Sequence, residues 1–156
     1  MKKVLFVCIH NSARSQMAEA LLNKYGHGEF EAFSGGLEPG VLNPLVVEVL
    51  KEDEGIDISG KKTKSAFEFV KEGKLFSYVV TVCDEGASQR CPIFPGVRER
   101  IMMSFEDPSE FTGDDEEKIE KIRAVKNEIK NEVFKFIKLV KEHKLKEELP
   151  KNWKLG

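Results

Sequence analysis

Four short apolar runs along the chain predict the strands of a buried sheet. The runs cover residues 3–7, 30–34, 78–82 and, more weakly, 100–105. The third run reads Tyr-Val-Val-Thr-Val, which is almost entirely apolar or β-branched, as expected for a central parallel strand covered on both faces. Glycines flank the second run on both sides and set its limits.

The segments between these runs have the apolar periodicity of helices. We predict helices over residues 12–25, 43–54, 65–72 and 115–142. Asn43 is expected to cap the second helix, with Pro44 at its first position. In the last helix the apolar residues recur at steps of three and four and form one stripe that packs on the core. That stripe consists of Ile119, Ile122, Val125, Ile129, Val133, Phe136, Ile137 and Val140.

Strands that alternate with helices through short connections predict an α/β fold. We expect a doubly wound, four-stranded parallel sheet with helices on both faces. Ligands of such sheets bind beyond the carboxyl ends of the strands, at a topological switch point. One catalytic domain is predicted over residues 1–142, followed by a charged tail over residues 143–156 in which Trp153 either packs or frays.

The composition narrows the possible partners. The 156 residues are 40% hydrophobic and 33% charged, as in a folded globular protein. A formal net charge of -2 gives no reason to expect nucleic acid or an anionic membrane as a partner.

No apolar run suits a transmembrane helix or a signal peptide, so we expect a cytoplasmic protein, and we expect it to be a monomer. Three cysteines without a Cys-x-x-Cys pair argue against a disulfide framework or a zinc site, and we expect no metal centre and no cofactor.

The strongest chemical signal lies in residues 8–15, which read Cys-Ile-His-Asn-Ser-Ala-Arg-Ser between a predicted strand and a predicted helix. A loop of this length can aim its backbone N–H groups at one centre, and Arg14 can add a bidentate fork for a tetrahedral oxyanion. The same field favours a thiolate, so Cys8 is expected to be a nucleophile. Alone, such a cysteine is more often a buried hydrophobe and such an arginine a surface charge; their spacing favours the functional interpretation. The predicted oxyanion-binding residues are Ile9, His10, Asn11, Ser12, Ala13, Arg14 and Ser15.

Two further cysteines follow the third predicted strand. Cys83 lies at its carboxyl end, on the same edge of the sheet as Cys8, and Cys91 follows after seven small or polar residues. We predict a deformable loop over residues 84–90 that lets Cys83 reach either of the other two thiols. The alternative is that Cys83 and Cys91 are inert.

An acidic residue follows the fourth predicted strand. Pro108 disfavours helix at Asp107, so the carboxylate is expected to project from an extended segment. An acid in that position can protonate a departing oxygen. Asp-Pro is also an ordinary turn, and this second interpretation stays open at this point.

Residues 8–15, together with Asp107 and Pro108, resemble the low-molecular-weight protein tyrosine phosphatase family. The added pattern Cys83-x7-Cys91 followed by proline resembles the branch of thioredoxin-coupled arsenate reductases. The resemblance extends over about residues 1–142 and implies the corresponding fold.

The resemblance also implies a mechanism. The thiolate of Cys8 attacks arsenate held by the loop and Arg14, and Asp107 donates a proton to the departing oxygen. Cys83 then attacks the sulfur of the adduct, arsenite leaves, and a Cys8–Cys83 disulfide remains. Cys91 moves the disulfide to Cys83–Cys91, where thioredoxin reduces it.

Supporting roles follow from the same resemblance. Asn11 would brace the loop by hydrogen bonds, and Ser15 would stabilise the thiolate. Some relatives bind potassium beside the loop. Asn11, Glu19 and Ser34 match that pattern, but no matching acid is found near Ser65.

The sequence departs from the family pattern in three places. Many relatives have glycine at the position of His10, so the pocket mouth is expected to be narrower or to carry a titratable group, unless His10 is merely exposed. Many have a cysteine at the position of Ala13, so in this chain Cys8 has no second thiol within its own loop. The spacing between Cys83 and Cys91 is one residue longer than in the reductase branch.

Two other functions compete with arsenate reduction. A phosphatase of this fold would hydrolyse phosphotyrosine or another phosphomonoester through a phospho-enzyme on Cys8. Such phosphatases typically carry tyrosines just after the Asp-Pro pair, where this chain has Ser109 and Glu110. A redox sensor or anion-binding module could use the same thiols, but a pure thiol sensor needs neither Arg14 nor Asp107.

Overall fold

The computed structural model describes residues 1–83 and 85–156; Asp84, in the polar segment predicted to deform, lies outside the described residues. The strands are β1 (Lys2–Cys8), β2 (Phe30–Gly36), β3 (Tyr78–Thr81), β4 (Glu99–Met102) and β5 (Lys154–Leu155). The helices are α1 (Arg14–Tyr25), α2 (Pro44–Glu54), α3 (Ala66–Lys71), α4 (Glu85–Arg90) and α5 (Asp115–Lys141), with a single 3-10 turn, η1 (Pro108–Glu110). No helix among these described residues has the length and apolarity needed to cross a bilayer.

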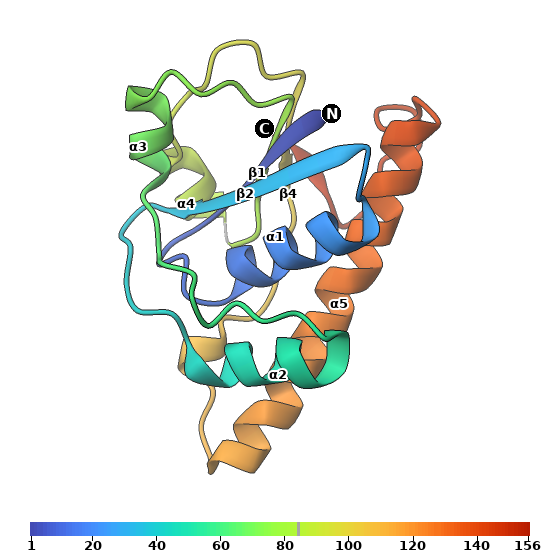
Figure 1. Ribbon diagram of the computed structural model, residues 1–156. Coiled ribbons are helices and arrows are strands. Elements are labelled where there is room, and N and C mark those ends of the chain that lie inside the picture. Colours follow the sequence, from blue (N-terminus) through green and yellow to red (C-terminus); the bar gives the residue numbers. More distant parts are fainter. Residues whose placement is uncertain (84) are drawn as a thin grey trace.

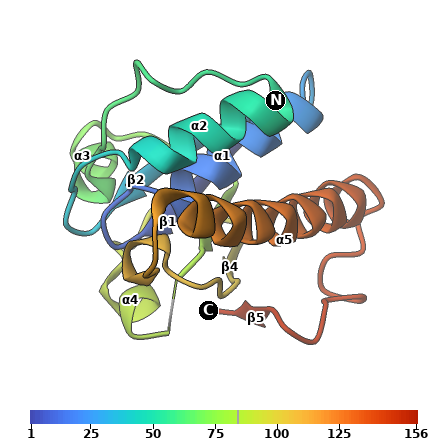
Figure 2. The same cartoon turned by 90° about the horizontal axis from the view of Figure 1, so that it is seen from below.

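The strands form one sheet in the order β2-β1-β3-β4-β5. The first four are parallel, which confirms the doubly wound α/β fold. The strand order reverses between β1 and β3, so the switch point of the fold lies where Cys8 ends β1. The views in Figures 1 and 2 show α1, α2 and α5 grouped on one side of the sheet, and α3 and α4 toward the other.

A fifth strand was not predicted. Leu155 pairs with Ile101 and Lys154 with Met102, antiparallel to β4. Two residues are too few to show a strand period, so the sequence gives no signal there. β4 itself is shorter than predicted, four residues instead of the six at 100–105, and ends at Met102.

The helix limits follow from the residues at their starts. Asn43 caps α2 through a hydrogen bond that its side chain accepts from Leu45 N at 2.9 Å, with Pro44 at the first position, as predicted. α5 begins at Asp115 as predicted and ends one residue before the predicted limit. α1 begins at Arg14, two residues later than predicted, because the preceding residues belong to the loop that follows Cys8.

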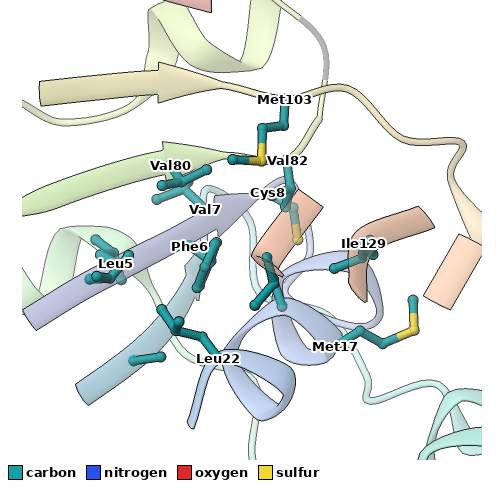
Figure 3. Close-up of a cluster of buried hydrophobic side chains, with 14 of the residues drawn as sticks. Leu5, Phe6, Val7, Cys8, Met17, Leu22, Val80, Val82, Met103 and Ile129 are labelled. Atoms are coloured by element: carbon teal, nitrogen blue, oxygen red, sulfur yellow. The ribbon is translucent and has the colours of Figure 1, made fainter. Parts of the chain in front are cut away.

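The core fills the space between the sheet and its helices. Figure 3 shows Phe6 and Cys8 on the side of β1 that faces Leu22 of α1 and Ile129 of α5. The predicted stripe of α5 lies against this core. Its fully buried members are Ile122, Val125, Ile129, Val133, Phe136 and Val140, whereas Ile119 and Ile137 are partly buried.

The segment after α5 packs on the body of the protein. Trp153 is 2% exposed, and its Nε1 donates to Glu132 Oε2 at 2.7 Å. Leu145 is buried as well, and the backbone N–H of Gly156 donates to the carbonyl of Arg100 at 2.8 Å. Of the two outcomes considered for Trp153, the structure has the packed one.

A buried carboxylate joins α1, α2 and α5. The Glu54 side chain is 1% exposed; it accepts a hydrogen bond from Tyr25 Oη at 2.6 Å and forms ion pairs with Lys24, Lys126 and Lys130. Burial alone raises the pKa of this carboxyl, but the hydrogen bonds from Tyr25 and two lysines outweigh it and lower the pKa from 4.5 to about 2. The cluster therefore stabilises the packing of the three helices as long as Glu54 is ionised.

Replacing Glu54 with glutamine is expected to destabilise the fold by roughly 3 kcal/mol at pH 7, the low end of the cost of breaking a buried ion pair. Because the folded pKa is lowered, the contribution of Glu54 is present above pH 4.5 and is lost as the pH falls toward about 2. Urea unfolding should therefore show a smaller difference from wild type at pH 3 than at pH 7. The exposed neighbour Glu52 is the control, since Glu52→Gln should change stability little; a difference for Glu54→Gln that is constant with pH would contradict the interpretation.

Candidate active site

The thiol of Cys8 lies among hydrogen-bond donors at the end of β1. The backbone N–H of Asn11 donates to Cys8 Sγ at 3.2 Å, and Ser15 Oγ lies 2.8 Å from the same sulfur. A thiolate can only accept, so the Ser15 hydroxyl is the donor when the sulfur is ionised. Both contacts favour the anionic nucleophile.

The loop after Cys8 turns its amide groups inward. The carbonyls of Cys8, Ile9 and His10 all accept backbone hydrogen bonds, 2.7 to 3.1 Å long, from the chain just after β2. The carbonyl of Ser12 accepts another, at 3.0 Å, from Asn43 N. Because each peptide is planar and trans, the N–H group that follows each of these carbonyls points the opposite way, toward the centre of the loop. The result is a concave set of donors suited to an anion at the start of α1.

Close contact with β2 requires a glycine beside this loop. A Cβ atom on Gly36 would lie 2.8 Å from the carbonyl oxygen of Ile9 and 2.9 Å from Asn11 N. Backbone atoms cannot give way at such distances, so only glycine fits here.

Asn11 braces the loop, as the resemblance implies. It has a left-handed backbone with φ of 55°, which asparagine tolerates better than most residues. Its Nδ2 donates to Ser15 Oγ at 2.8 Å. Its Oδ1 accepts from Gln16 Nε2 at 3.1 Å and from the backbone N–H of Lys64 at 2.9 Å. The roles of Gln16 and Lys64 were not predicted, because nothing in the local sequence links them to the loop.

The structure brings Arg14 and Asp107 together from distant parts of the chain. Arg14 is buried, its Nη1 donates to the carbonyl of Phe105 at 3.1 Å, and its Nη2 lies 3.5 Å from Asp107 Oδ2. Asp107 has the predicted extended backbone and also caps η1 by accepting from Ser109 N at 2.9 Å. Asp-Pro is thus both a turn and the source of a carboxylate at the site.

The second thiol also reaches this edge of the sheet. The backbone N–H of Val82 donates to the carbonyl of Val7 at 2.9 Å, which places Val82 beside Cys8 (Figure 3). Cys83 comes next and is 1% exposed, with its Sγ 3.8 Å from the same carbonyl. The topology therefore brings Cys83 to the strand end next to Cys8, as predicted.

The third thiol lies beyond α4. Cys91 is 5% exposed, and burial raises its pKa although nearby Arg100 opposes the shift. The segment before it was predicted to be a loop, and this is wrong for six of its residues, which form α4. Its sequence Glu-Gly-Ala-Ser-Gln-Arg contains four good helix formers, which explains the local helix.

Comparison with known proteins decides the family. A model of the family described as low molecular weight phosphotyrosine protein phosphatase matches residues 3–149. The chain belongs to this family.

Relatives within the family include both reductases and phosphatases. An arsenate reductase of Halalkalibacterium halodurans is 38% identical over 136 residues, which cover 86% of this chain and 94% of that protein. A thioredoxin-dependent arsenate reductase of Corynebacterium glutamicum is similar in structure, with a TM-score of 0.60 and 34% identity over 90% of this chain and 63% of the other. A low molecular weight protein tyrosine phosphatase of T. tengcongensis has a TM-score of 0.68 at 25% identity, over 88% of this chain and 99% of the other.

His10 departs from the family pattern and is exposed at the mouth of the loop. Its Nδ1 donates to the carbonyl of Glu38 at 2.9 Å. Glu38 in turn pairs with Arg90 of α4 at 2.9 Å, and this arginine lowers the pKa of the Glu38 carboxyl. The mouth of the site is thereby linked to the helix that precedes Cys91, a connection that the sequence did not predict.

The potassium site that some family members have does not fit this chain. Glu19 Oε1 accepts a hydrogen bond from Ser34 Oγ at 2.8 Å, and Glu19 Oε2 lies 2.9 Å from Lys61 Nζ. Asn11 Oδ1 already accepts two hydrogen bonds. The oxygens that would surround a metal cation are therefore engaged, and an ammonium group is already in contact with the carboxylate.

Proposed function

We propose that the chain is an arsenate reductase in which Cys8 attacks arsenate and thioredoxin returns the enzyme to its reduced form. The observation that carries this proposal is the position of Cys83, at the end of β3 next to the end of β1 that bears Cys8. A phosphatase needs only the first thiol. Relatives named arsenate reductase, one of them thioredoxin-dependent, support the same activity.

The proposed chemistry begins in the loop after β1. Its N–H groups and Arg14 hold arsenate, and the Cys8 thiolate attacks the arsenic atom while one oxygen leaves as water with a proton from Asp107. Cys83 then attacks Cys8 Sγ. The sulfur–arsenic bond breaks, its electron pair stays on arsenic, and arsenite leaves. Arsenic has gained two electrons and the two cysteines have formed a disulfide.

A second exchange frees Cys8 for the next cycle. Cys91 attacks the Cys83 sulfur, and the resulting Cys83–Cys91 disulfide is reduced by the dithiol of thioredoxin. α4 occupies six of the seven positions between these two cysteines, and a disulfide requires their Cα atoms to lie roughly 4.4–6.8 Å apart. We expect α4 to unwind at this step.

Two features support unwinding of α4. The Arg90–Glu38 ion pair is more than half exposed at both side chains, so it holds the helix only weakly. Burial raises the pKa of Cys91 and keeps its thiol protonated, so its attack should follow its exposure. We therefore propose that the segment predicted to deform does so by the opening of this short helix.

The groups proposed for the site all lie between residues 8 and 107. The division into a catalytic domain over residues 1–142 and a tail over residues 143–156 stays a prediction, as do the monomeric state and the cytoplasmic location.

Replacing Asp107 with asparagine keeps the size and polarity of the side chain but removes the acid. Turnover of arsenate is expected to fall about 10²- to 10⁴-fold, the usual contribution of general acid catalysis. Phosphate binding, measured by calorimetry, should change little because Arg14 and the loop remain. Glu110→Gln, at the exposed end of η1, is the control and should leave both quantities unchanged. Full turnover combined with weakened anion binding would reverse the assignment.

One paired assay tests the proposed function. Arsenite release is measured with thioredoxin present, and phosphomonoester hydrolysis is measured in parallel without a reductant. We expect multiple turnovers of arsenate that stop when thioredoxin is omitted. Rapid phosphomonoester hydrolysis without arsenite release would favour the phosphatase, the second function that the T. tengcongensis structure supports.

A further inference from the structure

We propose that Glu38 and Arg90 form a latch between the loop after β1 and α4, and that this latch limits how often Cys91 is exposed for its attack on Cys83. Both are positioning residues, because they act through α4 and not on a reacting atom. The proposal deepens the thiol exchange proposed above and rests on it for its catalytic consequence, while the latch itself can be measured in the reduced protein without arsenate.

Glu38 is fixed to the loop that carries Cys8. Three backbone hydrogen bonds, 2.7 to 3.1 Å long, join residues 37–40 to the carbonyls of residues 8–10. The ring of His10 adds a further contact, since its Nδ1 donates to the carbonyl of Glu38 at 2.9 Å. The backbone of Glu38 is therefore held in place by the loop.

Arg90 is the other half of the latch. It is the last residue of α4 and directly precedes Cys91. Its Nη2 donates to Glu38 Oε2 at 2.9 Å, and the hydrogen bond and positive charge of Arg90 lower the pKa of the Glu38 carboxyl. Both groups are charged near neutral pH, so an ion pair ties the end of α4 next to Cys91 to the loop of Cys8.

Two departures of this chain from the family pattern meet in the latch. His10 stands where many relatives have glycine, which has no side chain to hold the carbonyl of Glu38. The segment between Cys83 and Cys91 is one residue longer than in the reductase branch, and it ends with Arg90. The latch gives both departures one structural role.

The second exchange needs Cys91 to leave its closed position. Its thiol is buried, and burial raises its pKa, so the closed form keeps it protonated. On exposure it loses its proton to water, and the thiolate attacks Cys83 Sγ; the Cys8–Cys83 bond breaks and Cys8 leaves as a thiolate. Because the loop holds residues 37–40, the latch opens by movement of α4. The rate of this exchange should therefore follow the fraction of molecules in which the latch is open.

The test measures alkylation of Cys91 by iodoacetamide in the reduced protein, with peptide mass spectrometry to resolve it from the other two thiols. A buried thiol reacts through the open form, so the rate reports the population of that form. Glu38→Gln and Arg90→Gln should each raise the rate about two- to fivefold, the effect expected of an exposed ion pair. High sodium chloride should raise the rate in wild type and change it little in the two variants.

Matched variants separate the latch from a general loss of charge. Arg98→Gln, at an exposed arginine that also follows α4, should behave as wild type. The reversed pair, Glu38→Arg with Arg90→Glu, should restore slow alkylation, which separate structural roles of the two side chains would not do. His10→Gly should raise the rate in wild type but not in Glu38→Gln, because it acts through the same contact.

A second measurement connects the latch to catalysis. Reduced protein is mixed with arsenate, quenched in acid at successive times and mapped for disulfides. In Glu38→Gln the Cys8–Cys83 disulfide should form at the wild-type rate, and its conversion to Cys83–Cys91 should be faster by the same factor as the alkylation of Cys91.

The two measurements fail in different ways. Equal alkylation rates in wild type, Glu38→Gln and Arg90→Gln would overturn the latch, as would a reversed pair that reacts as fast as the single variants. Faster alkylation with an unchanged conversion rate would remove the latch from the catalytic cycle. An absence of arsenite release and of any disulfide would overturn the thiol exchange instead, while the alkylation rates would still decide whether the latch exists.

Discussion

Cys8→Ser is expected to abolish arsenate reduction and phosphomonoester hydrolysis together. A serine hydroxyl stays protonated near neutral pH and is a far weaker nucleophile than a thiolate. The contacts that favour the anion, from Asn11 N–H at 3.2 Å and Ser15 Oγ at 2.8 Å, cannot ionise a hydroxyl. By comparison with the loss of nucleophiles in other enzymes, the fall in turnover should be on the order of 10⁶-fold. Arsenite release and hydrolysis of an aryl phosphate measure the two activities.

Anion binding distinguishes a chemical defect from a structural one in this variant. Arg14 and the inward N–H groups of the loop are unchanged, so Cys8→Ser should still bind phosphate in a calorimetric titration. Either activity near the wild-type level would show that Cys8 is not the nucleophile.

Cys83→Ser and Cys91→Ser are each expected to stop multiple turnover of arsenate with thioredoxin. Cys83→Ser lacks the thiol that breaks the sulfur–arsenic bond, so it should release no arsenite. Cys91→Ser should release about one arsenite per enzyme and then stop, because no thiol remains to free Cys8. Rapid-quench measurement of arsenite separates the two cases.

Phosphomonoester hydrolysis serves as the internal control for these two variants. Water can resolve a phospho-cysteine without a second thiol, so any hydrolysis present in wild type should survive both substitutions. If hydrolysis were lost as well, the substitutions would have damaged the loop around Cys8. Multiple turnover by either variant would remove that cysteine from the cycle.

The sequence predicted those parts of the site whose signal is local. Cys8 ends β1 and Arg14 begins α1, so they border one short loop, and their spacing alone was enough to predict that loop as the anion site. Cys83 was placed correctly because the carboxyl ends of parallel strands share one edge of a sheet. The assignment of Asp107 to the site required the family resemblance as well, since an Asp-Pro pair by itself is typical of a turn.

The supports of the loop could not be predicted, because they are contacts between distant residues. Lys61 meets Glu19 across 42 positions, and Lys64 meets Asn11 across 53. Each of these lysines looks like an ordinary solvated charge in a lysine-rich segment. The requirement for Gly36 likewise arises only from the approach of β2 to the loop.

Two errors in the fold have different causes. α4 was predicted as a loop because Gly86 and several polar residues suggested an irregular segment, whereas its helix formers decided the local structure. β5 was not predicted because its pairing with β4 depends on a long-range contact. The burial of Trp153 brings the residues that follow it back to the edge of the sheet.

The most direct test of the proposed thiol exchange is to map the disulfides in Cys91→Ser after a single arsenate turnover. The protein is quenched in acid with an alkylating agent, digested and analysed by mass spectrometry. The proposed mechanism predicts a Cys8–Cys83 disulfide in about the amount of arsenite released. Catalytic arsenite release with no disulfide at Cys83 would contradict it.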